Sequence, residues 1–149
     1  VLPFFFNSTC KTPDGLKVGA PVRMVSKNGK HAAVVGDVIE FDPPYRYAHT
    51  FQFTSLDDPP CIIRYELKEV DEGTEFTLIS ERVPEGSKSE KYMESGGHFI
   101  TTNFRAFVET GKATSGGRFA LFMMGLTAFM TPKSCRIENW PFDRKVNVD

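Results

Sequence analysis

The sequence predicts an α+β domain in which a twisted antiparallel sheet packs against one amphipathic helix. Residues 16–82 hold successive segments that alternate apolar and polar side chains, the pattern of half-buried strands, and turn residues separate these segments. Residues 100–108 instead follow helical spacing with one apolar stripe. A sheet that curves around a helix leaves a cavity between the two apolar faces. We therefore expect a ligand rather than a reaction, because the chain offers no comparable group of catalytic residues.

Composition limits the classes of function. The chain has 149 residues, enough for one domain with a sizeable core, and a formal net charge of -1. This charge creates no strong field for nucleic acid or for an anionic membrane surface. Fourteen Phe residues indicate a bulky aromatic interior or pocket lining. The three cysteines are widely spaced and form neither a disulfide framework nor a CxxC metal site, so we expect a reducing, cytoplasmic setting.

Two strands are predicted between residues 16 and 41. The first is marked by apolar residues at alternate positions, namely Leu16, Val18, Ala20, Val22 and Met24. Asn28-Gly29 then predicts a tight hairpin, because both residues tolerate positive φ. The second strand runs from His31 to Phe41. It stops at Asp42-Pro43-Pro44, because proline donates no hydrogen bond to a sheet ladder.

Three further strands follow in the same way. The third has one aromatic face, made by Tyr45, Tyr47, His49, Phe51 and Phe53. One face of the fourth holds Cys61, Ile63, Tyr65 and Leu67. After a turn at residues 71–73, Phe76 and Leu78 mark the inner face of a fifth strand that ends near Arg82.

Helical segments are predicted in the last third of the chain. Residues 83–97 are polar and rich in Gly and Pro, which predicts a loop or lid. The next segment has the i, i+4, i+7, i+8 spacing of a helix that stops at Gly111; its apolar stripe is Ile100, Phe104, Phe107 and Val108.

A second, very apolar helix is predicted from Phe119 to Met130, ended by Pro132. It is too short for a membrane span, which needs about 20 residues, and it lacks the polar face of an interfacial helix. Three alternatives remain for this segment. It packs against the sheet, it fills the place of a missing N-terminal segment, or it forms a homodimer contact with another subunit.

Four stretches resemble a known family when taken in order. Residues 36–44, G-D-V-I-E-F-D-P-P, resemble the "G-x-V-x-E-x-x-P-P" strand and turn of the SRPBCC (START-like) superfamily. Three further stretches are similar to one branch of this superfamily. They are residues 18–24, the pair of segments 64–67 and 73–78, and the Gly96-Gly97 pair before a helix that ends at residues 108–111. That branch comprises homologues of the activator of heat-shock protein 90 ATPase. The resemblance covers residues 16–112.

The resemblance implies a helix-grip fold, a curved antiparallel sheet wrapped around a long helix with an apolar cavity between them. It also implies one domain over residues 1–149, with residues 113–149 as a C-terminal extension. The strand and two short helices with which the family usually begins are mostly missing, and we expect the protein to start upstream of Val1. The family's aromatic residue at the start of the long helix is replaced by Gly97-His98.

A cavity in such a fold would be lined by apolar and aromatic side chains with a few polar groups. The apolar candidates are Met24, Val38, Phe51, Phe53, Tyr65, Phe76, Leu78, Phe104 and Phe107. The alternative for each is ordinary core packing, which every domain needs.

Three polar residues are candidates to point into the cavity. Glu40 has the same strand parity as Val38, which predicts the same face; a carboxylate buried there would have a raised pKa and could transfer a proton. Tyr65 lies on the inner face of the fourth strand, and His98 lies where the helix start would meet the cavity mouth. The alternatives are a solvated strand end for Glu40 and a chance position for His98.

Three functional hypotheses follow. The first is binding of a small hydrophobic molecule, lipid-like or polyketide-like. The second is a cyclase or hydrolase that uses Glu40, Tyr65 or His98, and the third, implied by the resemblance, is an interaction module that stimulates a chaperone ATPase. No HExxH, paired-Cys, GxGxxG, GxxxxGK or G-x-S-x-G motif occurs, so we expect no metal, no cofactor and no nucleic-acid partner.

Overall fold

The computed structural model describes residues 2–148, so Val1 and Asp149, the two ends of the predicted domain, lie outside the described residues. The strands are β1 (Thr9–Lys11), β2 (Pro21–Val25), β3 (Ala32–Asp42), β4 (Arg46–Phe53), β5 (Cys61–Val70) and β6 (Gly73–Glu81). The α-helices are α1 (Lys88–Thr110) and α2 (Ser115–Leu126). Short 3-10 helices are η1 (Pro3–Phe5), η2 (Ala128–Met130), η3 (Lys133–Cys135) and η4 (Ile137–Asn139).

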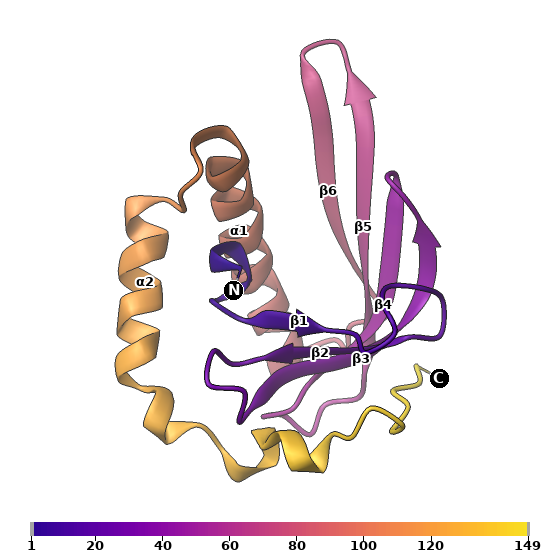
Figure 1. Ribbon diagram of the computed structural model, residues 1–149, viewed down its shortest axis with the longest axis vertical. Coiled ribbons are helices and arrows are strands. Elements are labelled where there is room, and N and C mark those ends of the chain that lie inside the picture. The colour runs from indigo at the N-terminus through magenta and orange to yellow at the C-terminus, as the bar shows by residue number, and fades with distance from the viewer. Residues whose placement is uncertain (1, 149) are drawn as a thin grey trace.

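The six strands form one antiparallel sheet in the order β1-β2-β3-β4-β5-β6, so each strand pairs with its neighbour in sequence. The sheet curves, the long helix α1 lies on its inner face, and the β5–β6 hairpin extends beyond the rest of the sheet (Figure 1). This arrangement confirms the predicted α+β class and the helix-grip architecture. Short loops explain the simple order, because antiparallel neighbours need only a turn between them.

Strand boundaries follow the sequence prediction except at the N-terminal side. Leu16 and Val18 lie exposed before β2, although their alternation predicted a strand. Gly19, with φ +84°, turns the chain there, and β2 begins two residues later. The short strand β1, which pairs with β2, was not predicted because three residues are too few to show alternation.

The predicted loop or lid over residues 83–97 is wrong from residue 88 onward, because α1 begins at Lys88. Ser87 caps the helix by accepting a hydrogen bond from the Glu90 N–H, and the Glu90 carboxylate accepts one from the Gly86 N–H. This S-x-x-E pattern is a helix-start signal that outweighs the polar composition of the segment. At the other end, Gly111 adopts φ +76° and ends α1 where the sequence predicted.

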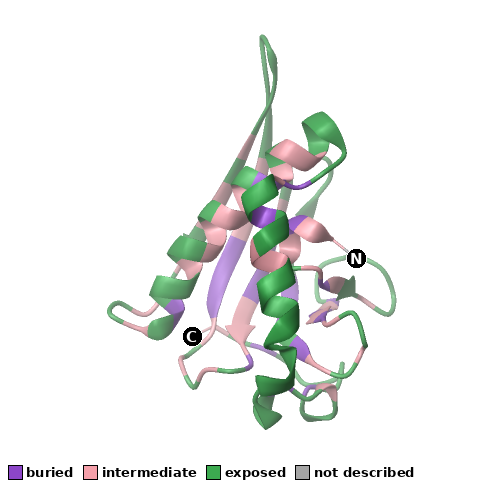
Figure 2. Ribbon diagram, turned by 90° about the vertical axis from the view of Figure 1, so that its left-hand side faces the viewer, coloured by how far each residue is buried: buried purple, intermediate pink, exposed green. Residues whose placement is uncertain are grey.

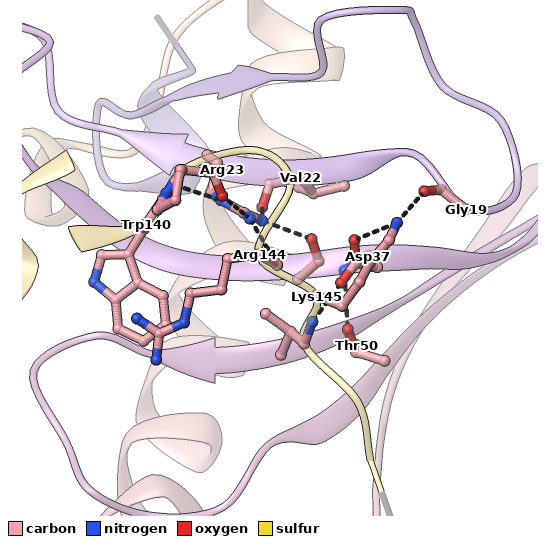
Figure 3. Close-up of polar contacts among 11 residues, drawn as sticks. Gly19, Val22, Arg23, Asp37, Thr50, Trp140, Arg144 and Lys145 are labelled. Atoms are coloured by element: carbon pink, nitrogen blue, oxygen red, sulfur yellow. Dashed lines mark hydrogen bonds and ion pairs between the residues drawn. The ribbon is translucent and has the colours of Figure 1, made fainter. Parts of the chain in front are cut away.

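The C-terminal segment covers the outer face of the sheet, opposite α1. Trp140 and Val146 pack there against Ala32 and Val35 of β3. Figure 3 shows the segment crossing β2 and β3, with polar contacts from Arg23 and Asp37 to its backbone. The predicted extension beyond residue 112 therefore packs in part on the sheet.

Arg23 is the central residue of this contact, with 0% of its surface exposed. Its Nε donates to the Trp140 carbonyl, and its Nη2 donates to the carbonyls of Pro141 and Arg144. Its Nη1 donates to two carbonyls of the sheet, those of Val22 and Gly36. Every donor position of the guanidinium therefore has an acceptor, which is how a buried charge is tolerated.

The helix α2 follows α1 through a turn held by Asn103, whose Oδ1 accepts hydrogen bonds from the Thr114 N–H and hydroxyl. Gly117 leaves room for this amide, since a Cβ there would lie 2.0 Å from Asn103 Oδ1. Beyond the turn most residues of α2 are exposed, apart from the half-buried Ala120 and Leu121 (Figure 2). None of the helices within residues 2–148 is long and apolar enough to cross a membrane.

Candidate functional site

A cavity of about 230 Å³ lies between the inner face of the sheet and α1. Strands β1, β2, β4, β5 and β6, the helix α1 and the 3-10 helix η1 all contribute to its walls, which are mainly apolar. The lining residues are Phe4, Phe5, Cys10, Val22, Met24, Tyr47, His49, Tyr65, Phe76, Ile100 and Phe104. No carboxylate belongs to this set.

The structure brings some of the predicted apolar residues together. Those that line the cavity are Met24, Tyr65, Phe76 and Phe104. Val38 packs beside the cavity against Val22 and Tyr47, and the Phe107 ring lies 5.3 Å from that of Phe4. Phe51 and Phe53 pack on one another farther along β4, and Leu78 lies against Gly97 of α1. A ligand-binding role for any of these residues stays a prediction.

Glu40 does not face the cavity. The prediction that it shares a face with Val38, made from their spacing of two residues, is therefore wrong. The register of β3 and β4 shifts between Val38 and Glu40, so Val38 pairs with His49 whereas Glu40 pairs with Ala48. A bulge of this kind adds one residue and turns the following side chains to the other face. On the outer face the Glu40 carboxylate forms ion pairs with Arg64 and Arg46.

His98 does not lie at the cavity mouth, where the sequence placed it. Its side chain is exposed on α1 and does not line the cavity. Ile100 and Phe104, one turn apart, face the cavity. A residue two positions before Ile100 lies about 200° around the helix, which is the opposite side. The expected role at the cavity mouth depended on a helix that starts near residue 97, and α1 starts nine residues earlier, at Lys88.

Phe4 and Phe5 in η1 form a wall that the sequence argument did not assign. Phe4 is buried, and its ring lies 5.1 Å from that of Phe104 in an edge-on arrangement. Phe5 contacts Tyr65 with a centroid distance of 6.2 Å. The signal was present in the sequence as three consecutive Phe residues, a density of aromatic side chains that is difficult to leave in water.

His49 is the most buried polar residue of the cavity, at 4% exposure, and it was predicted only as part of the aromatic face of its strand. Its ring lies 5.3 Å from Tyr47 and 6.0 Å from Tyr65, and the Tyr65 ring is nearly parallel to it at 19°. Burial lowers the pKa of His49 to about 4, so the imidazole is neutral at pH 7. Burial also raises the phenol pKa of both tyrosines, which keeps their hydroxyl groups protonated.

The orientation of His49 is set by the backbone. Its Nδ1 lies 2.7 Å from the Thr50 carbonyl oxygen. Gly36 of β3 makes this geometry possible, because a Cβ at that position would lie 1.7 Å from the same oxygen and 3.1 Å from His49 Nδ1. The first glycine of the G-x-V-x-E-x-x-P-P segment therefore serves close packing rather than a turn.

The chemistry available in the cavity is limited. A neutral imidazole and two protonated phenols can exchange hydrogen bonds with a ligand, whereas no carboxylate lines the cavity to act as a partner for proton transfer. Cys10 lies on β1, and burial raises its thiol pKa, which disfavours the reactive thiolate. Across residues 2–148, no group of three His, Cys, Asp or Glu side chains could hold a metal ion.

Comparison with solved structures finds the same fold in proteins of low sequence identity. DynU16, from the dynemicin biosynthetic locus, matches with a TM-score of 0.59 and 21% identity over 74% of this chain and 39% of its own. The chain thus spans well under half the length of DynU16. An HSP90 activator from Plasmodium falciparum matches with a TM-score of 0.55 and 16% identity over 73% of this chain and 77% of its own.

CalU16 from Micromonospora echinospora matches with a TM-score of 0.52 and 17% identity over 85% of this chain and 70% of its own. Identities this low show a shared fold and leave function open. The comparison with curated proteins found no match.

A family model gives the more specific result. The model described as "Activator of Hsp90 ATPase homolog 1-like protein" matches residues 3–109, which include η1, the whole sheet and nearly all of α1. The match ends before α2 and the C-terminal segment, which are the parts outside the helix-grip unit. The chain therefore belongs to the Activator of Hsp90 ATPase homolog 1-like family within the SRPBCC superfamily.

Proposed function

We propose that this protein binds a small hydrophobic molecule in the cavity between the sheet and α1. The observation that carries the proposal is the cavity itself: about 230 Å³ of space surrounded by aromatic and aliphatic side chains. The space is a partly open pocket between two elements, where a small molecule can enter and be covered on several sides. A mainly apolar wall with a few polar groups is typical of small-molecule sites.

The volume limits the size of the ligand. An engineered cavity of roughly 150 Å³ accepts benzene, which has six carbon atoms. By proportion, 230 Å³ holds about nine non-hydrogen atoms, the size of a two-ring molecule. A long acyl chain exceeds this volume, so a compact ring system fits the cavity better.

The test uses indane, a stable hydrocarbon with nine carbon atoms, and equilibrium dialysis. We expect the wild-type protein to bind indane and the variant Ile100→Trp to lose this binding at least tenfold, because the larger side chain fills the space. Val108→Trp is the matched control, since Val108 lies on the same helix but is exposed. Its binding should equal that of the wild type.

Two results would contradict the proposal. One is that the wild-type protein retains no indane above the level of the dialysis blank. The other is that Ile100→Trp and Val108→Trp bind it equally. Native mass spectrometry of freshly purified protein gives an independent measurement, in which a retained apolar molecule would support the proposal.

A co-chaperone function is the second candidate, and the family match over residues 3–109 is the observation that favours it. In that case the protein would act through its surface, and the cavity would be secondary. A concentration-dependent rise in the ATPase rate of a heat-shock protein 90 chaperone would support this function, and a flat response would exclude it. The cyclase or hydrolase alternative, which used Glu40, Tyr65 or His98, keeps only Tyr65 in the cavity, because Glu40 and His98 both lie outside it.

A further inference from the structure

We propose that the cavity selects a two-ring aromatic molecule that carries one N–H or O–H group, and that Nε2 of His49 accepts the hydrogen bond from this group. The inference rests on the proposed function, since it names the class of ligand for the same site. It adds a polar anchor to a pocket that would otherwise select by size and hydrophobicity alone.

The first step is the tautomer of His49. Its Nδ1 lies 2.7 Å from the Thr50 carbonyl oxygen, and a carbonyl oxygen can only accept a hydrogen bond. Nδ1 therefore carries the proton. In a neutral imidazole the other nitrogen, Nε2, then has a free lone pair and can only accept.

The second step is that Nε2 faces accessible space. Among the described residues, the His49 ring forms one hydrogen bond, which joins Nδ1 to the Thr50 carbonyl oxygen. Nε2 therefore has no hydrogen-bond partner among them. Yet within residues 2–148 no fully buried side-chain nitrogen or oxygen lacks a partner. Nε2 must therefore keep some accessible surface, and the space that the His49 ring lines is the cavity.

The third step concerns the shape of the ligand. The rings of Tyr47, His49 and Tyr65 lie side by side on β4 and β5, with centroid distances of 5.3 to 6.0 Å. Phe76 continues this wall beyond Tyr65, at 6.1 Å and 29°. A wall of aligned rings gives most contact to a flat aromatic molecule, which can stack or meet it edge-on.

The fourth step is that the acceptor persists at physiological pH. Desolvation lowers the pKa of His49 to about 4, so the ring stays neutral and Nε2 stays unprotonated at pH 7. A ligand that fills the cavity but has no donor would leave Nε2 buried without a hydrogen bond, and this makes the binding free energy less favourable. A ligand with a donor at the right place avoids that cost.

The experiment compares indole with indane, which share a nine-atom bicyclic frame. Indole has an N–H donor and an aromatic five-membered ring, whereas indane has no donor and a saturated one, so the ring difference is cancelled by taking the ratio of affinities in two proteins. Equilibrium dialysis gives both dissociation constants for the wild type and for His49→Phe, which keeps an aromatic ring and removes both nitrogens. We expect the ratio of indole to indane affinity to be about tenfold higher in the wild type than in the variant, the size that one net hydrogen bond supports.

The outcomes separate the two proposals. If wild type and variant bind both probes with the same ratio, the cavity binds ligand and the His49 inference is wrong. If neither probe binds the wild type, both proposals are wrong. If His49→Phe does not fold, ¹⁵N NMR of histidine-labelled wild-type protein decides: indole and not indane should move the Nε2 resonance, and an unmoved resonance overturns the inference.

Discussion

A backbone contact at one glycine shapes the wall of the cavity. Gly36 lies on β3 directly against the Thr50 carbonyl group, and that carbonyl in turn accepts the hydrogen bond from His49. The absence of a side chain at residue 36 therefore lets the two strands approach and holds the imidazole in one orientation. At this scale the shape of the cavity wall depends on the missing side chain at Gly36 as well as on the side chains around it.

We expect Gly36→Ala to lower the free energy of unfolding by about 1–3 kcal/mol, because the added Cβ would lie 1.7 Å from a backbone oxygen that has little freedom to move. Urea denaturation measures this change. Gly125→Ala is the control, since a Cβ there meets nothing within 4 Å and alanine favours a helix. Equal stability of Gly36→Ala and wild type would show that the close approach is absent.

Side-chain faces could be predicted from the sequence only where the strand is regular. Alternation placed Tyr65 and Phe76 correctly on the inner face, because β5 and β6 pair without a register shift. It failed for Glu40, since the bulge after Val38 depends on the partner strand and leaves no mark in the period of β3 itself. A bulge is a property of two strands, and one segment of sequence does not reveal it.

At the scale of elements, strands β2 to β6 and the existence of both helices could be predicted, because each has a periodic pattern or a clear stop residue. The bounds of the helices could not, since α1 begins at Lys88 and α2 spans Ser115–Leu126 rather than residues 119–130. The contribution of η1 could not, because a three-residue 3-10 helix has no period, and its burial depends on where α1 lies. The capping signal at Ser87 and Glu90 was in the sequence, and it shows that local hydrogen-bond chemistry defines a helix start better than polarity does.

The segment formed by α2 and η2 presents more apolar surface than a monomer usually exposes. Phe119, Phe122 and Phe129 are 62–85% exposed. At roughly 150–250 Å² for each aromatic side chain, they leave about 400 Å² uncovered. The Met and Leu side chains of the same segment add a comparable area, so the total approaches the ~800 Å² per partner of a standard interface.

We therefore expect a second copy of the chain to cover this surface, which was one of the three alternatives that the sequence left open. A net charge of -1 opposes such pairing little. Phe122→Glu should weaken the dimer more than tenfold, because the interface would bury a charge without a partner. Sedimentation velocity over a concentration series measures this. Ser55→Glu, at an exposed loop position, adds the same charge elsewhere and should leave the dimer unchanged. A wild-type protein that stays monomeric at all concentrations would contradict the prediction.

At the scale of the whole molecule, the sheet is covered on both faces, on the inner face by elements inside the family match and on the outer face by a segment beyond it. Residues of η1 and α1 lie over the inner face and line the cavity there. The C-terminal segment beyond residue 109 covers the outer face of β2 and β3 (Figure 3). Asp37 adds to this contact, because its carboxylate accepts a hydrogen bond from the Val146 N–H and lies 3.3 Å from Lys145 Nζ. The tail thus contacts the two strands that carry Val22 and Gly36.

Replacing Arg23 tests whether this contact holds the tail in place. In Arg23→Met the three carbonyls of the tail lose their donors while a side chain of similar length remains. Hydrogen bonds from a charged donor contribute more than neutral ones, so we expect the Val146 amide to exchange its hydrogen about ten to a hundred times faster. Amides of β5 should keep their wild-type exchange rates, because the tail opens locally.

Arg136→Met serves as the matched control for this prediction. Arg136 lies in the same C-terminal segment, but its guanidinium is exposed and contacts Glu138 at 3.4 Å on the surface. Its loss should leave exchange at Val146 unchanged, since exposed ion pairs contribute little. If the Val146 amide exchanges at the same rate in both variants, packing of Trp140 and Val146 alone would hold the tail. If β5 opens together with the tail in Arg23→Met, the segment is instead an integral part of one cooperative fold.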